Sequence, residues 1–125
     1  MIFANWIVGP HLIGVIFLLA ALIQKHYPPK EINSLYGYRT NLSMKNQQNW
    51  DEGNRYSTAL MFTYSWILII AGIAITGLLM LIPLSPEART LIKVILMLAG
   101  AIATAILLFR VTEKHLRETF DDKPL

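Results

Sequence analysis

A polar segment between two apolar stretches holds most of the side chains in this sequence that are suited to binding. Residues 36–57 combine aromatic rings, amides and cations, which supply flat surfaces, directed hydrogen bonds and bidentate capture of carboxylates or phosphates. The candidate binding residues are Tyr36, Gly37, Tyr38, Arg39, Thr40, Ser43, Lys45, Asn46, Trp50, Asn54 and Arg55. We expect this segment either to hold a ligand or to form a tight polar joint.

An indole between two amides recurs at a helical spacing in this segment. Asn46, Trp50 and Asn54 are four residues apart, so on a helix they lie on one face. One interpretation is a wall that contacts a ligand. The other is a helix that docks its polar side on neighbouring helix ends, with the amides capping exposed carbonyls. Both interpretations predict that Trp50→Ala is damaging.

The cations of the segment also allow two interpretations. Arg39, Lys45 and Arg55 are suited to gripping an anionic headgroup or a peptide carboxylate. They are equally suited to flanking a membrane span, where each contributes about 1 kcal/mol near anionic lipid. The position of Arg39 inside a tyrosine–glycine turn favours binding for that residue. For Arg55, the four-residue spacing predicts an ion pair with Asp51.

Few other residues are suited to catalysis or metal binding. His11 is an ionisable residue within an apolar stretch, which indicates a functional site by default. It can instead bond a backbone carbonyl that Pro10 leaves without a donor. His26 and His115 are expected at the surface, and three scattered histidines in a chain without cysteine give no metal-ligand spacing. We expect no catalytic residue, no metal site and no cofactor.

The composition indicates a membrane protein. Hydrophobic residues make up 54% of the 125 residues and charged residues 15%, whereas soluble domains have about 25% charged residues. The basic residues are spread over several segments and form no nucleic-acid-binding motif. The absence of cysteine excludes disulfides and thiolate chemistry. The lipid bilayer is therefore the expected partner, and nucleic acid is not.

The apolar stretches predict an all-α membrane domain of three transmembrane helices. The spans are expected at about 2–24, 57–82 and 89–110, each long enough to cross ~30 Å of hydrocarbon. The polar segment forms a motif loop at 28–56, and a charged tail at 111–125 continues the last helix for two or three turns. The whole chain is expected to form a single domain.

Local signals add detail to this arrangement. Pro10 predicts a kink, or a first helix that becomes regular only after it. Gly37 is expected to take a positive φ between its tyrosines. Ser43 is the expected N-cap of a juxtamembrane helix at about 44–54, between the first and second spans, which leads into the second span with or without a bend. Lys93 is expected to extend its ammonium outward from near the end of the third span.

The placement of lysine and arginine predicts the orientation. On the side of the membrane where the second span connects to the third, the only cations are Arg89 and Lys93. Nine cations belong to the motif loop, the tail and the span ends next to them, namely Lys25, Lys30, Arg39, Lys45, Arg55, Arg110, Lys114, Arg117 and Lys123. Because cytoplasmic segments carry the excess of positive charge, we expect the N-terminus outside and both the motif loop and the C-terminus in the cytoplasm.

The polar segment resembles a known family. The residues that carry the likeness are Pro28, Pro29, Lys30, Glu31, Ile32, Asn33, Tyr36, Gly37, Tyr38, Arg39, Thr40, Ser43, Met44, Lys45, Asn46, Trp50 and Asn54. In this order they are similar to the SdpI family, bacterial membrane proteins named for immunity to the peptide toxin SdpC. The resemblance implies a three-helix membrane unit, residence in the bacterial cell (inner) membrane and resistance to a peptide toxin. It also implies a role in sequestering a transcriptional repressor at the membrane.

The leading hypothesis is an immunity-type protein that protects the membrane without catalysis, by binding a peptide toxin in or at the bilayer. The alternatives are a membrane enzyme or oligomeric transporter acting on an anionic amphiphile, and an accessory anchor that sequesters a cytoplasmic regulator. Small residues four apart on the third span, Ala99 with Ala103 and Ala101 with Ala105, allow close helix packing. They pack either within the bundle or across a homodimer.

Overall fold

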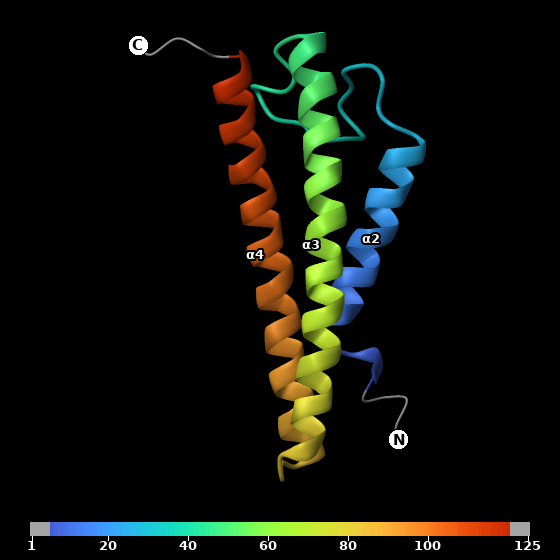
Figure 1. The fold of residues 1–125 in the computed structure, drawn as a ribbon, viewed down its shortest axis with the longest axis vertical. Helices are drawn as coiled ribbons and strands as arrows, with labels where there is room; N and C mark the ends of the chain where they lie inside the picture. Colours follow the sequence, from blue (N-terminus) through green and yellow to red (C-terminus); the bar gives the residue numbers. More distant parts are fainter. Residues whose placement is uncertain (1–5, 121–125) are drawn as a thin grey trace.

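The computed structural model describes residues 6–120, and the regular elements of this range are α-helices. They are α2 (Pro10–His26), α3 (Gln47–Leu81) and α4 (Pro86–Phe120). Figure 1 shows α3 and α4 running side by side along the molecule, with α2 lying along α3. The loop between α2 and α3 folds back beside the start of α3, at the end of the bundle where α4 finishes. The predicted all-α class is confirmed.

The bundle has small and polar residues inside and large apolar residues outside. Among the described residues, the buried hydrophobic ones are Ala21, Trp50 and Leu116. Buried polar or charged residues are more numerous, namely Ser43, Asn49, Asn54, Ser57, Ser65, Thr76, Lys93, Thr104 and Thr112. Many large apolar side chains of all the helices are exposed, including Leu19, Ile70 and Ile102. Helices in lipid pack through small and polar residues and present apolar ones outward, so this pattern indicates a membrane protein.

Two helices are long and apolar enough to cross a bilayer. These are α3 and α4, each of 35 residues. At 1.5 Å per residue such a helix is about 52 Å long, which exceeds the ~30 Å of hydrocarbon. Their polar ends, 47–56 on α3 and 111–120 on α4, therefore extend beyond the apolar layer. Helix α4 thus continues through the tail, as the sequence predicts.

The helix of the first apolar stretch is interrupted before Pro10, because Trp6 and Ile7 are helical, Val8 and Gly9 are not, and α2 begins at Pro10. Gly9 precedes it with φ 155°, and Pro10 occupies the first helical position. Pro10 cannot donate to the carbonyl of Trp6, and Nε2 of His11 donates to that oxygen instead, at 2.6 Å. The prediction that Pro10 disturbs the first helix is confirmed. Helix α2 has 17 residues, and the part of the predicted 2–24 span before Trp6 lies outside the described residues.

Glycines bring α2 and α3 into close contact. A Cβ at Gly14 would lie 2.8 Å from the backbone oxygen of Ser65, and a Cβ at Gly72 would lie 2.2 Å from the backbone nitrogen of His11. Any side chain at either site would push the two backbones apart. On α4, Gly100 faces Leu68 of α3, where a Cβ would lie 3.2 Å from the leucine side chain. This part of the small-residue surface therefore packs within the bundle.

The helix expected at about 44–54 is present as the first turns of α3, but its expected cap is wrong. Helix α3 begins at Gln47 and continues without a break through the second apolar stretch. The N-cap is Asn46, whose Oδ1 accepts a hydrogen bond from the backbone of Asn49 at 2.8 Å. Ser43 instead closes a turn with Thr40. An amide capping its own helix thus takes the place of the serine cap.

The turn between α3 and α4 is held by arginine. Arg89 donates to the carbonyls of Leu79 and Ile82, both at 3.0 Å, and so satisfies carbonyls at the end of α3 that have no intrahelical partner. Lys93, one turn further along α4, is only 2% exposed. The expectation that it extends outward is therefore wrong, since its side chain lies inside the bundle.

Candidate functional site

The loop between α2 and α3 is attached to α3 by a set of buried hydrogen bonds, which we call the polar joint. Trp50 is fully buried, and its Nε1 donates to the carbonyl of Pro29 at 2.6 Å. Asn54 accepts from the backbone nitrogen of Tyr38 at 2.6 Å and donates to the carbonyl of Trp50 at 2.9 Å. Two members of the predicted stripe, Trp50 and Asn54, thus hold the loop, and the third, Asn46, caps the helix.

Gly37 allows the loop to reach Asn54. Its φ is 111°, which confirms the expected positive value. A Cβ at this position would lie 2.6 Å from Oδ1 of Asn54 and 2.8 Å from Cγ of Pro29. Glycine is thus required both for the backbone conformation and for the close approach of the loop to α3.

The polar joint extends to α4 through Glu113. Its Oε2 accepts hydrogen bonds from the hydroxyls of Tyr38, at 2.7 Å, and Thr40, at 2.8 Å. Burial, and then the adjacent Glu113 carboxylate, raise the pKa of Tyr38 well above its usual value, so this phenol remains a donor. One carboxylate thus ties the loop to a helix more than 70 residues later in the chain.

Replacing Glu113 with alanine is expected to lower the free energy of unfolding by about 2 kcal/mol, because two hydroxyls lose a charged acceptor. The measurement is unfolding of the detergent-solubilised protein by a denaturing detergent. Glu118→Ala is the matched control, because Glu118 is an exposed carboxylate on the same helix and its loss should change stability by about 0.5 kcal/mol or less. Equal stability of the two variants would show that Glu113 does not anchor the loop.

The remaining predicted site residues also make internal contacts or face outward. The Tyr36 hydroxyl donates to the carbonyl of Tyr27, and the exposed Arg39 guanidinium donates to the carbonyl of Ser34. The hydroxyl of Ser43 donates to the carbonyl of Tyr38 at 2.9 Å. Lys45 is exposed. A ligand-binding role for these residues stays a prediction.

Arg55 belongs to a second cluster, which the sequence interpretation missed. The predicted Asp51–Arg55 ion pair is wrong, because Arg55 makes two hydrogen bonds with Glu52, at 2.8 and 2.6 Å. The other partner of Glu52 is His115 of α4, whose Nε2 lies 2.6 Å from Oε2. The imidazole also stacks on Tyr56 with ring centroids 3.8 Å apart, so His115 is not the plain surface residue that was expected.

This cluster predicts a loss of stability in acid. The pKa of Glu52 is lowered from 4.5 to about 2, mainly by the hydrogen bond from Arg55, which outweighs the opposing effect of burial; the bond with His115 lowers it further. Because the folded-state pKa lies below the ordinary one, the carboxylate stabilises the fold above pH 4.5, and this contribution is lost as the pH falls from 4.5 to 2. The melting temperature should fall over that window, and the fall should be shallower in Glu52→Gln. Parallel curves for the two proteins would contradict this assignment.

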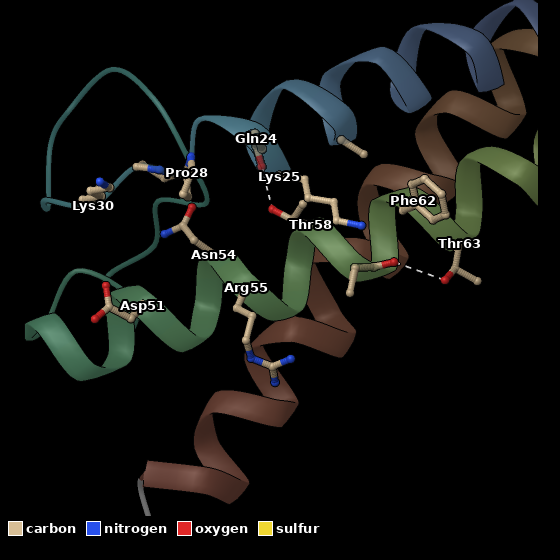
Figure 2. Close-up of a pocket in the computed structure, with 13 residues that line it drawn as sticks. Gln24, Lys25, Pro28, Lys30, Asp51, Asn54, Arg55, Thr58, Phe62 and Thr63 are labelled. Carbon is tan, nitrogen blue, oxygen red and sulfur yellow. Dashed lines mark hydrogen bonds between the residues drawn. The ribbon is translucent and has the colours of Figure 1, made fainter.

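A cavity of about 630 Å³ opens between the end of α2 and the first half of α3. It lies beside the polar joint, and the residues that line it are Ala21, Gln24, Lys25, Pro28, Pro29, Lys30, Asp51, Asn54, Arg55, Thr58, Ala59, Phe62 and Thr63. Figure 2 shows Lys25 extending from α2 toward Thr58 and Phe62 of α3, next to the hydrogen bond between Thr58 and Gln24. The lining of the cavity thus combines apolar walls with two lysines.

Of the predicted site residues, only Asn54 and Arg55 line this cavity. Lys25, Lys30 and Phe62 were missed as site residues, because the lysines read as ordinary flanks of a membrane span. A signal was present in the sequence, since Thr58 and Phe62 continue the four-residue spacing from Asn54 and so lie on one face of α3. That Thr58 and Phe62 face Lys25 across the cavity could not be predicted, because it depends on how α2 packs against α3.

The histidine at the start of α2 has one bonded and one unbonded nitrogen. His11 Nε2 donates to the carbonyl that Pro10 frees, which is the structural interpretation of this residue. Its Nδ1 is buried without a hydrogen-bond partner among the described residues, as is Oγ1 of Thr76. A Cβ at Gly9 would lie 2.9 Å from the first of these atoms and 3.4 Å from the second, so both border the same break in the helix.

The comparisons with known proteins agree with the resemblance in the motif loop. A family model described as the SdpI/YfhL protein family matches residues 30–111, which include most of the motif loop, all of α3 and most of α4. The chain is also similar to the uncharacterized protein YfhL of Bacillus subtilis (strain 168), with 38% identity over 104 residues, covering 83% of this chain and 82% of that protein. No solved structure is significantly similar to the chain.

Proposed function

Because this chain belongs to the SdpI/YfhL protein family, we propose that it is an immunity-type membrane protein, which confers resistance to a peptide toxin by binding in or at the bilayer without catalysis. The observation that carries the proposal is the polar joint. Its indole, amide and hydroxyl groups are bonded to the loop, to α3 and to α4, so they act as a scaffold that holds a shaped surface at the end of the bundle.

The proposed topology has three spans, with the motif loop and the tail in the cytoplasm of a bacterial cell. It is supported by the nine lysines and arginines of these segments against two at the other end. It is also supported by the Tyr38–Glu113 bond, which requires the loop and the end of α4 to lie on one side of the membrane. Helix α2, with 17 residues, is at the short end of the range for a span, about 17–25 residues.

Single cysteines test this topology, because the chain has none of its own. With an impermeant thiol reagent on intact cells, a cysteine at Ser85 is expected to react and one at Asn41 to react only after the cells are opened. Labelling of Asn41 but not Ser85 from outside would reverse the orientation. If both positions are labelled from outside, they lie on the same side of the membrane and α3 does not cross it.

Protection by expression tests the function. A host sensitive to membrane-active peptides, when it expresses this chain, is expected to survive a higher concentration of at least one peptide in a broad panel. If no peptide of the panel is tolerated better than by cells with an empty vector, the immunity proposal fails.

A matched pair of variants then tests whether the loop takes part in the binding. Arg39→Ala is expected to reduce protection at unchanged expression and melting temperature, because this exposed guanidinium can reach a partner outside the bundle. Lys45→Ala, which removes a neighbouring exposed cation, is the control and should protect as the natural chain does. If Arg39→Ala instead lowers the melting temperature, the bond from Arg39 to Ser34 has a structural role.

A further inference from the structure

The cavity between α2 and α3 has a net positive lining at the polar end of the bundle. Lys25, Lys30 and Arg55 are its cations, and Asp51 is its acid. The charge of Arg55 is balanced by Glu52, and Asp51 accepts a hydrogen bond from Gln47. Within residues 6–120, neither lysine has a carboxylate within ion-pair distance. The lining therefore has two cations to offer to an anion.

Lys25 is placed for such a ligand. Its Nζ lies 5.9 Å from the centre of the Phe62 ring, within the range of a cation–π contact, and its side chain is exposed, so a ligand in the cavity can reach it. The Thr58 hydroxyl donates to Oε1 of Gln24 across the same gap at 3.0 Å, so the hydroxyl and the amide add polar groups next to it. Phosphate oxygens bind to lysine ammonium groups of this kind.

The rest of the cavity is suited to an apolar body. Its walls include Ala21, Pro28 and Ala59. From Phe62, exposed apolar side chains continue along the same face of α3 at four-residue spacing, through Trp66 and Ile70, which are 44% and 66% exposed. This stripe runs from the cavity into the part of α3 that is apolar enough to cross the bilayer. The natural occupant thus has an anionic head and an apolar tail.

We propose that this cavity binds an anionic phospholipid of the surrounding bilayer. Its headgroup phosphate lies at the Lys25 ammonium, Lys30 adds positive charge further along the same lining, and an acyl chain follows Phe62, Trp66 and Ile70. A free phosphate ion would use the cations but not the apolar walls or the stripe. The site goes beyond the proposed immunity, because its occupant is a component of the membrane itself and the binding does not require a toxin.

The test measures lipid retained by the full chain after extraction. The protein is reconstituted in nanodiscs of equal parts phosphatidylglycerol and phosphatidylcholine and then examined by native mass spectrometry. The natural chain is expected to retain phosphatidylglycerol in preference. The preference should fall about fivefold for Lys25→Gln or Lys30→Gln and about thirtyfold for the double variant, because each of these lysines lines the cavity and attracts the headgroup held there.

Lys114→Gln is the matched control, because it removes an exposed lysine from the same end of the bundle and should leave the preference unchanged. Ala59→Leu fills the apolar wall and keeps every charge, so it should also reduce retention. An equal preference in the double variant and the Lys114 control would overturn the proposal. So would displacement of the lipid by millimolar inorganic phosphate, which would identify a site for the free ion.

Discussion

Replacing Trp50 with alanine is expected to lower the free energy of unfolding by about 3–5 kcal/mol, a larger loss than at any other residue of the polar joint. The indole is fully buried, so its removal leaves a cavity where the loop meets α3. It also leaves the carbonyl of Pro29 without its donor, which costs about 1–3 kcal/mol if water does not replace it. Titration of the detergent-solubilised protein with a denaturing detergent measures the loss.

Trp66→Ala separates this effect from the general cost of losing a tryptophan from α3. Trp66 is 44% exposed and lies on the outward face, where its ring contacts Phe62 edge to face. Its replacement should cost well under half of the loss at Trp50, because lipid or detergent fills the space that the side chain leaves. Equal losses in the two variants would show that the indole of Trp50 does not hold the polar joint.

Replacing Gly72 with alanine is expected to destabilise the bundle by about 1–3 kcal/mol, as overpacking does elsewhere. The added methyl group would lie 2.2 Å from the backbone nitrogen of His11 and 2.8 Å from its Cα, and neither atom can move without α2. The two helices must therefore separate. The expected result is earlier unfolding in the same detergent titration.

Gly77→Ala is the control for this second substitution. Gly77 is also in α3, but a Cβ there would meet no heavy atom within 4 Å. With no steric cost, alanine should stabilise the helix by up to about 1 kcal/mol. The two substitutions should thus have opposite signs although they are five residues apart on one helix. A stabilised Gly72→Ala would show that α2 does not pack this closely on α3.

These contacts change how the polar segment is understood. The aromatic and amide residues suggest a binding wall, yet Trp50, Asn54 and Tyr38 use their polar atoms to fasten the loop. The surface available to a ligand lies beside them, between Lys25 and Phe62. A substitution in the polar joint is therefore expected to reduce function mainly through stability, and one in the cavity mainly through binding.

Features set by neighbouring residues could be predicted from the sequence. The order of apolar stretches indicates the helices. An apolar stretch that is buried or faces lipid must satisfy its backbone hydrogen bonds internally, and a helix does so. Pro10 predicts the late start of α2, because proline lacks an amide hydrogen, and Gly37 predicts a positive φ, because it lacks a Cβ. The resemblance in the motif loop also led to the family.

Only the tertiary structure decided how distant groups pair. Glu113 accepts a hydrogen bond from Tyr38, which is 75 positions earlier in the chain, and nothing near either residue in the sequence indicates this contact. Arg55 has two possible carboxylate partners in α3, Asp51 four residues earlier and Glu52 three residues earlier. It pairs with Glu52, which also bonds His115 of α4. Lys93 is buried and Lys25 lies over a phenyl ring because of how the helices pack. Helical periodicity gives the face on which a side chain lies, but the neighbour across that face depends on the rotation and spacing of a separate helix.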